Sequence, residues 1–270
     1  MDAEEWFHVP GHKAYAEPSR WETLPATFPR ALDRTLALLD KGSWRATFFM
    51  LGWIARRYPA EIRRIAQAGH EIACHGEDHL LVNRMSPCHF HADLSSARSA
   101  IEDAAGAAVR GFRAPMWSMP RERWPYDTLS SLGFTYSSSR LPIPGLGLGR
   151  TAPSRIGEVW EIPVLASGWG PFAWPAGGTV ALRLLPISWL RRARDTAVAR
   201  GRPAVYWFHP WELLEDAPRA EGGAFFRWAR FARLDRLPAR LAELIPAGDR
   251  TLAAVLRHLD GVPQTGHTVG

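Results

Sequence analysis

Lysine and cysteine are both scarce in this 270-residue sequence. Lys13 and Lys41 are the only lysines among 33 basic residues, so arginine carries almost all of the net charge of +6. The arginines are spread along the chain among acidic residues rather than gathered in one patch, and this pattern does not favour a nucleic-acid partner. The two cysteines, Cys74 and Cys88, are too few for a disulfide framework.

Long apolar runs are also missing. No segment approaches the roughly 18 residues of a membrane span, and no basic region followed by an apolar segment marks a secretion signal. We therefore expect no transmembrane segment and a cytoplasmic location. With 46% apolar and 22% charged residues, the composition is that of a folded globular protein.

Short β-rich runs alternate with helical patterns along most of the chain, which is typical of an α/β fold with a mainly parallel sheet. The expected strands cover residues 45–52, 70–75, 109–115, 134–139, 158–165 and 203–210. The expected helices cover residues 59–69, 89–106, 126–133 and 186–200. About six strands after residue 45 favour one barrel-like domain over two domains.

Two segments rich in glycine and proline, 140–157 and 166–183, are expected to be loops. The second holds Trp169, Phe172 and Trp174, whose rings could line a groove. The basic, aromatic and amphipathic sequence after these loops, beyond residue 222, fits either a helix on a membrane surface or a terminal helix packed on the barrel. We favour the packed helix.

The strongest local signal of chemistry is "HGEDH" at residues 75–79. If these residues begin a helix, His75 and His79 lie on one face, about 6 Å apart along the axis, and both can bind one metal ion. The pair follows an expected strand, at the carboxyl end where βα folds place their sites. Two histidines alone are weak evidence, so a third ligand is needed.

Two further strand ends carry groups that suit hydrolysis. In "FRAPMWS" (112–118), Arg113 could hold a carboxylate while Trp117, expected to be exposed, stacks on a sugar ring. The simpler alternative is a surface salt bridge beside a buried aromatic residue. In "YWFHPWE" (206–212), His209 ends an apolar run and is either a satisfied core residue or a general acid or base.

The first residues, "MDAEEWFH", hold three carboxylates. Taken alone they would be a solvated terminus. On an extended strand, however, Asp2 and Glu4 point to one face and Glu5 points to the other.

The order of these motifs, together with "TFFMLGW" (47–53) and "LGFTYSSS" (132–139), closely resembles the NodB-homology polysaccharide deacetylases. The likeness is greatest to the subgroup associated with exosortase-linked exopolysaccharide gene clusters. The resemblance implies a distorted (β/α) barrel, here with a first strand that is either truncated or begins further upstream. It also implies a catalytic domain over residues 1–250, followed by a terminal helix and disordered tail over residues 251–270.

The resemblance further implies a divalent metal, usually zinc, and the removal of N-acetyl groups from an N-acetylated polysaccharide or oligosaccharide in exopolysaccharide biosynthesis. Asp2 falls on the catalytic base, Arg113 on the residue that orients the base, and His209 on the acid that protonates the leaving amine.

The metal ligands implied by the resemblance include His75 and His79. The third ligand is open, because Ala3 stands where the family has a second aspartate. The alternation of side chains along a strand favours Glu4, with Glu5 as the alternative. Three residues beside these motifs are expected to contact substrate: Pro115, Trp117 and Trp211.

Two departures from the family pattern carry their own expectations. Ser137 stands where many relatives have an aspartate, so the imidazolium of His209 would be less stabilised and would titrate lower. Only Met1 precedes Asp2, so the catalytic base would be poorly held.

These departures leave two alternatives to the deacetylase. Ala3, Ser137 and the short first strand favour a catalytically impaired, glycan-binding member of the same fold. A hydrolase of cyclic amides or imides would use similar metal-assisted chemistry on the same scaffold. The presence of both histidine motifs together with Arg113 favours the deacetylase.

Overall fold

The computed structural model describes residues 1–8, 18–142, 151–168, 173–218, 224–248 and 251–261. Its strands are β1 (Asp2–Ala3), β2 (Thr47–Met50), β3 (Glu71–Cys74), β4 (Gly111–Phe112), β5 (Tyr136–Ser137), β6 (Ser154–Ile156), β7 (Val159–Glu161), β8 (Ala166–Ser167) and β9 (Trp174–Pro175). Its α-helices are α1 (Phe28–Lys41), α2 (Gly52–Arg57), α3 (Pro59–Gln67), α4 (Pro87–Ala105), α5 (Trp124–Ser131), α6 (Thr179–Leu184), α7 (Ile187–Ala199), α8 (Ala224–Phe231), α9 (Leu237–Leu244) and α10 (Leu252–Gly261). Short 3-10 helices are η2 (Pro18–Thr23), η3 (Val82–Arg84), η4 (Pro115–Trp117), η6 (Pro210–Leu213) and η7 (Leu234–Arg236).

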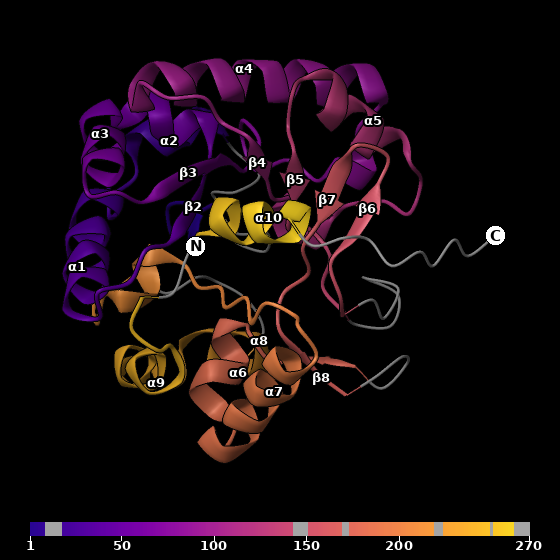
Figure 1. The fold of residues 1–270 in the computed structure, drawn as a ribbon. Helices are drawn as coiled ribbons and strands as arrows, with labels where there is room; N and C mark the ends of the chain where they lie inside the picture. The colour runs from indigo at the N-terminus through magenta and orange to yellow at the C-terminus, as the bar shows by residue number, and fades with distance from the viewer. Residues whose placement is uncertain (9–17, 143–150, 169–172, 219–223, 249–250, 262–270) are drawn as a thin grey trace.

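Seven of these strands form one sheet in the order β1-β2-β3-β4-β5-β7-β6. Neighbouring strands in this sheet run parallel from β1 to β7, and β6 pairs antiparallel with β7. Parallel strands need crossover connections, and helices α1 to α5 supply those from β1 to β5, around the outside of the strands (Figure 1). The protein therefore has the expected α/β fold, consistent with a distorted barrel.

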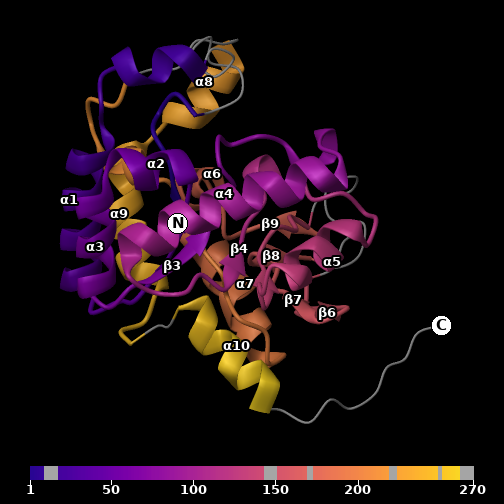
Figure 2. The ribbon, with the colours of Figure 1, turned by 90° about the horizontal axis from the view of Figure 1, so that it is seen from above.

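The two ends of the strands face different surroundings. At the amino ends, the backbone N–H of Leu252 donates to Thr47 Oγ1 (2.9 Å) and that of Ala253 donates to Glu71 Oε2 (2.9 Å), so α10 is fixed across the starts of β2 and β3. Helices α8 and α10 lie on opposite sides of the molecule (Figure 2). The carboxyl ends of β3 and β4, which lead to the histidine and arginine motifs, are directed away from α10.

The prediction of a strand over residues 203–210 is wrong. In the described structure this segment forms a single isolated bridge, between Gly178 and Trp207. Its backbone groups bond three separate partners, since Val205 accepts from Leu165, Trp207 donates to Gly177 and Phe208 accepts from Asp2. The segment thus bridges the β1 edge and the chain beyond β7 without forming a regular ladder.

Other boundaries also differ from expectation. Gly52 opens α2 rather than ending a strand, and it lets α2 approach α4, since a Cβ there would lie 2.8 Å from the Cα of Ala97. The expected loop at 140–157 contains β6, and the one at 166–183 contains β8, β9 and the start of α6. Trp169 and Phe172 fall outside the described residues.

Local sequence signals explain why helix α4 forms close to its expected position, residues 89–106. The Ser86 hydroxyl accepts a hydrogen bond from the His89 backbone N–H at the start of α4, and Gly106 ends the helix with a φ of +69°. Between them, Phe90, Leu94 and other apolar residues of one face are buried against the sheet.

The region after residue 222 forms helices rather than one long amphipathic segment. In α8 the Arg230 guanidinium lies 4.6 Å from the centre of the Trp211 ring, and Phe231 also contacts that ring. These contacts agree with the favoured packed helix for Phe231, whereas Trp228 of the same helix is 56% exposed, so the expected packing of the tryptophan is wrong. None of the described helices is both long and apolar enough to cross a membrane. Most of the expected tail, residues 262–270, lies outside the described residues.

Candidate active site

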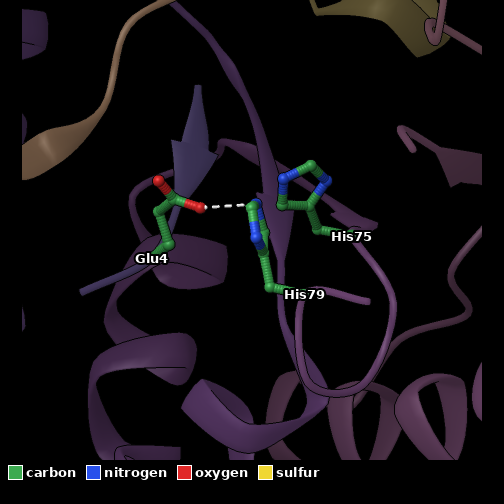
Figure 3. A group of neighbouring side chains, drawn as sticks. All are labelled: Glu4, His75 and His79. Atoms are coloured by element: carbon green, nitrogen blue, oxygen red, sulfur yellow. Dashed lines mark ion pairs between the residues drawn. The ribbon is translucent and has the colours of Figure 1, made fainter. Parts of the chain in front are cut away.

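Glu4, His75 and His79 come together in a buried group at the carboxyl ends of the strands (Figure 3). One possible ligand atom from each residue lies within 4.8 Å of the others, and Glu4 Oε2 is 2.9 Å from His79 Nε2. All three side chains are almost fully buried. The structure therefore brings together the two histidines and the glutamate that the strand argument favoured.

The two histidines are joined by a turn and not by the expected helix. Gly76 has a φ of +84° and His79 has a φ of +58°, so the chain turns back on itself between the two rings. The ring centres lie 5.2 Å apart. The spacing of four residues predicted the right pair, but a left-handed turn brings the rings together.

The chemical state of this group suits a divalent metal ion. His75 Nδ1 lies 2.7 Å from the carbonyl oxygen of Arg113, which can only accept, so Nδ1 carries the proton and Nε2 keeps its lone pair. Burial lowers the pKa of His75 to about 4, so the ring is neutral at neutral pH. Burial opposes the charge on Glu4, yet His79 and His209 hold the pKa of that carboxyl at about 2. Neutral imidazole and ionised carboxylate are the forms that bind metal.

The spacing also fits. Two ligands of a tetrahedral zinc ion lie about 3.3 Å apart, close to the 2.9 Å between Glu4 Oε2 and His79 Nε2. The residues present therefore fit the metal that the family resemblance implies.

Asp2 is held firmly, contrary to expectation. Its carboxylate accepts a hydrogen bond from Arg113 Nη1 at 2.7 Å, and its backbone N–H donates to the carbonyl of Phe208 at 3.2 Å. Burial alone would raise the pKa of Asp2, but Arg113 and His75 hold it well below its usual range.

Arg113 is itself fixed from several sides. Its Nε and Nη2 donate to the carbonyl and the hydroxyl of Ser138, both at 2.9 Å. Its guanidinium lies 4.1 Å from the centre of the Phe49 ring and 4.9 Å from that of Trp117. A buried guanidinium with these contacts has one orientation, and it presents that orientation to Asp2.

Glu5 has a structural partner of its own. Its carboxylate accepts hydrogen bonds from the backbone N–H groups of Thr27 and Phe28 at 2.9 Å and from the Tyr58 hydroxyl at 3.2 Å. It thus satisfies the first N–H groups at the start of α1, where Thr27 makes no side-chain cap. Glu5, the alternative third ligand, is therefore directed away from His75 and His79.

His209 lies beside the same group. Its Nε2 is 3.4 Å from Glu4 Oε1, and its Nδ1 is 3.0 Å from Glu212 Oε2. Burial would lower the pKa of His209, but Glu4 and Glu212 outweigh it and raise the pKa above its usual value. The expectation that His209 titrates lower is therefore wrong. The hydroxyl of Ser137 bonds Ser139 instead, and the carboxylate beside His209 comes from Glu212.

The three residues expected to contact substrate are all buried. Trp117 is 9% exposed, so the expectation of an exposed ring is wrong, and the neighbouring Met116, 48% exposed, is the accessible side chain. Trp211 is 2% exposed, with His209 stacked on it at 5.4 Å and Arg230 over its ring. Pro115 is buried as well. This arrangement does not favour stacking of a sugar on Trp211.

Sequence reasoning missed two residues of the site. Glu212 was seen only as the end of a motif, although a histidine followed three residues later by glutamate has the spacing of a capping box, which the structure contains. His8 is fully buried among Phe7, Trp21 and Trp53, and burial lowers its pKa to about 3. No local pattern distinguished it.

Two family models match successive parts of the chain. Residues 21–137 match the model described as "Polysaccharide deacetylase", and residues 138–253 match "Domain of unknown function (DUF3473)". The first segment contains His75, His79 and Arg113, and the second contains His209.

Parts of the chain are also similar to known deacetylases. A chitooligosaccharide deacetylase of Bradyrhizobium sp. (strain ANU 289) is 38% identical over 92 residues, which are 34% of this chain and 40% of that protein. One from Azorhizobium caulinodans (strain ORS 571) is 33% identical over 93 residues, 33% of this chain and 44% of that protein. The chain thus matches less than half the length of these relatives. A Mycobacterium smegmatis protein crystallised as a candidate polysaccharide deacetylase has the same fold, with a TM-score of 0.61 and 24% identity over 100% of this chain and 94% of that one.

Proposed function

We propose that this protein is a metal-dependent hydrolase that removes N-acetyl groups from an N-acetylated polysaccharide or oligosaccharide. The match of residues 21–137 to the polysaccharide deacetylase model supports this proposal. The observation that carries the proposal is the buried Glu4, His75 and His79 group, with the Asp2–Arg113 pair and His209 beside it. We further propose zinc as the ion and exopolysaccharide biosynthesis as the setting. The motif order of the exosortase-associated subgroup supports that setting.

A divalent ion held by Glu4, His75 and His79 would supply Lewis-acid activation of the acetamide carbonyl and of a water molecule. Asp2 is the group that accepts the proton of the attacking water, because it is ionised and its position is fixed by Arg113. A carboxylate with a lowered pKa is a weak base, so its catalytic effect depends on this fixed position.

His209 is the proton donor in this proposal. An amide nitrogen cannot leave as an amine anion, so the tetrahedral intermediate needs a proton on nitrogen before the C–N bond breaks. Glu4 and Glu212 raise the pKa of His209 above its usual value, which favours the protonated ring that this step needs, with Nε2 as the donating atom. The products are acetate and a free amino sugar.

The test is acetate release from N-acetylated chitooligosaccharides by purified protein, with added zinc and after chelation. Asp2→Asn and His79→Ala are expected to reduce the rate by at least about 100-fold, and chelation should abolish it. Activity that persists in both variants would overturn the mechanism. Zinc and glycan binding without turnover would instead favour the glycan-binding alternative.

A further inference from the structure

His209 is oriented by one carboxylate oxygen. Glu212 Oε2 accepts from the backbone N–H of His209 at 2.9 Å and lies 3.0 Å from its Nδ1. An ionised carboxylate only accepts, so Nδ1 carries the proton in this contact. The other ring nitrogen, Nε2, then faces Glu4 Oε1, in the direction of the candidate metal group.

Glu212 is held in turn through its second oxygen. The Thr179 hydroxyl donates to Oε1 at 2.6 Å, and Arg183 Nη2 lies 3.6 Å from the same atom. Arg183 also donates from Nε to the Thr179 hydroxyl at 3.1 Å. The carboxylate of Glu212 is therefore charged although it is buried, since these partners and His209 outweigh burial and lower its pKa.

Arg183, which helps to hold Glu212, is itself held by residues in and just after α8. Arg183 is fully buried, and its Nη1 and Nη2 donate to the backbone carbonyls of Ala232 and Ala229, the second at 3.2 Å. From the same region Arg230 covers the ring of Trp211, on which His209 stacks at an interplanar angle of 18°. Elements α6, η6 and α8 thus converge on one imidazole.

We propose that Glu212, held by Thr179 and Arg183, is a positioning residue that fixes the tautomer and orientation of His209 for proton donation. The inference rests on the proposed deacetylase function. All these residues lie in 138–253, the segment matched by a domain of unknown function, so the proposal also gives that segment a role: it builds and supports the proton donor.

Glu212→Gln is the sharpest perturbation because it keeps the size of the side chain. Thr179 and Arg183 both donate toward Oε1, so the amide oxygen of the glutamine takes that position. The amide NH₂ then faces both the backbone N–H and Nδ1 of His209. The backbone N–H loses its acceptor, and a neutral ring must accept at Nδ1 and carry its proton on Nε2. The exposed Glu215→Gln is the matched control three residues away.

The first measurement is the tautomer of His209 in long-range ¹H–¹⁵N spectra of the metal-free protein, recorded at a pH above the pKa of His209, where the ring is neutral and carries one proton. We expect the proton on Nδ1 in the wild type and in Glu215→Gln, and on Nε2 in Glu212→Gln. An unchanged tautomer in a folded Glu212→Gln protein would overturn the proposal. This readout does not depend on turnover, so it decides the positioning role even if the wild type releases no acetate, a result that would refute the proposed function alone.

The second measurement compares two substrates. An N-acetylated chitooligosaccharide needs a protonated leaving nitrogen, whereas 4-nitrophenyl acetate leaves as a stable phenolate and needs no acid. Glu212→Gln should lower kcat on the amide by at least about 100-fold with little change in KM, and should change ester hydrolysis less than about 3-fold. Equal losses on both substrates would indicate a purely structural role.

If Glu212→Gln does not fold, Thr179→Val takes its place. It removes the donor that holds Oε1 and should show the same selective loss on the amide, with a smaller amplitude. A folded Thr179→Val protein with wild-type rates on both substrates would contradict the proposed support of Glu212.

Discussion

Replacing Glu4 and Glu5 separately by glutamine distinguishes a metal ligand from a structural carboxylate. The two residues are adjacent and both are at most 2% exposed. Glu4 lies 2.9 Å from His79 Nε2, whereas the carboxylate of Glu5 accepts hydrogen bonds at the start of α1. Glu4→Gln should therefore impair metal binding, and Glu5→Gln should impair folding.

The size of the Glu5 effect follows from its contacts. The Thr27 N–H donates to both oxygens at 2.9 Å. Oε2 also accepts from the Thr27 hydroxyl, and Oε1 from the Phe28 N–H and the Tyr58 hydroxyl. A glutamine presents an NH₂ group to one of these buried sets of donors, so the donors of that set lose this acceptor or must rearrange, and every remaining bond loses the charge of the carboxylate. Each such loss costs about 1–3 kcal/mol, so Glu5→Gln should lower the free energy of unfolding by about 2–4 kcal/mol and the Tm by roughly 5–15 °C.

The assay pairs calorimetric zinc titration with thermal unfolding of the metal-free proteins. We expect Glu4→Gln to weaken zinc binding by more than about 100-fold, since even changes behind a ligand cost 10–100-fold. Its Tm without metal should change less than that of Glu5→Gln. The zinc affinity of folded Glu5→Gln, measured below its Tm, should stay within about 3-fold of the wild type.

The reverse pattern would refute this reasoning. If Glu5→Gln weakened zinc binding as much as Glu4→Gln while leaving the Tm unchanged, Glu5 would be the third ligand. The hydrogen bonds at α1 would then not describe its role.

Three further predictions concern residues around the site. Burial raises the pKa of Asp93 to about 7, so the folded protein holds a proton that the unfolded chain loses near pH 4; stability should fall by up to about 4 kcal/mol between these pH values. Asp93→Asn, which keeps an acceptor for the Glu77 N–H, should flatten that dependence in urea unfolding at pH 5 and 8, and an unchanged slope would contradict the assignment. Gly52→Ala places a Cβ 2.8 Å from the Cα of Ala97 and should cost about 1–3 kcal/mol in the same assay. Trp174 is 69% exposed, so Trp174→Ala should leave the Tm unchanged but raise KM for oligosaccharides several-fold; an unchanged KM would remove this ring from the substrate surface.

The regular helices were predictable because their signals are local. The helices expected at 59–69 and 89–106 appear as α3 (Pro59–Gln67) and α4 (Pro87–Ala105), where apolar periodicity and terminal glycines mark both. Segment 203–210 has the composition of a strand but not its pairing. Its hydrogen bonds go to residues from three distant parts of the chain, and no local pattern encodes that arrangement.

The candidate site was predictable where a motif carried it. Alternation along a strand favoured Glu4 over Glu5, and the structure agrees with that side-chain direction although β1 covers only Asp2–Ala3. Motif order singled out Arg113 and Asp2, whose contact spans 111 positions of sequence. Glu212 was missed because its role depends on partners in α6 and α8, which sequence spacing alone does not bring together.

The candidate site is built from both matched segments and from residues before them. His75 and Arg113 come from residues 21–137 and His209 from residues 138–253, while Glu4 lies before both. The boundary also cuts the sheet between β5 and β7, which pair directly, and separates Arg113 from both of its contacts with Ser138. A fragment ending at residue 137 would expose an unpaired strand edge and would lack His209, the proposed proton donor. The two segments therefore need each other: the first carries two of the three candidate metal ligands, and the second completes the sheet and carries His209, the proposed acid.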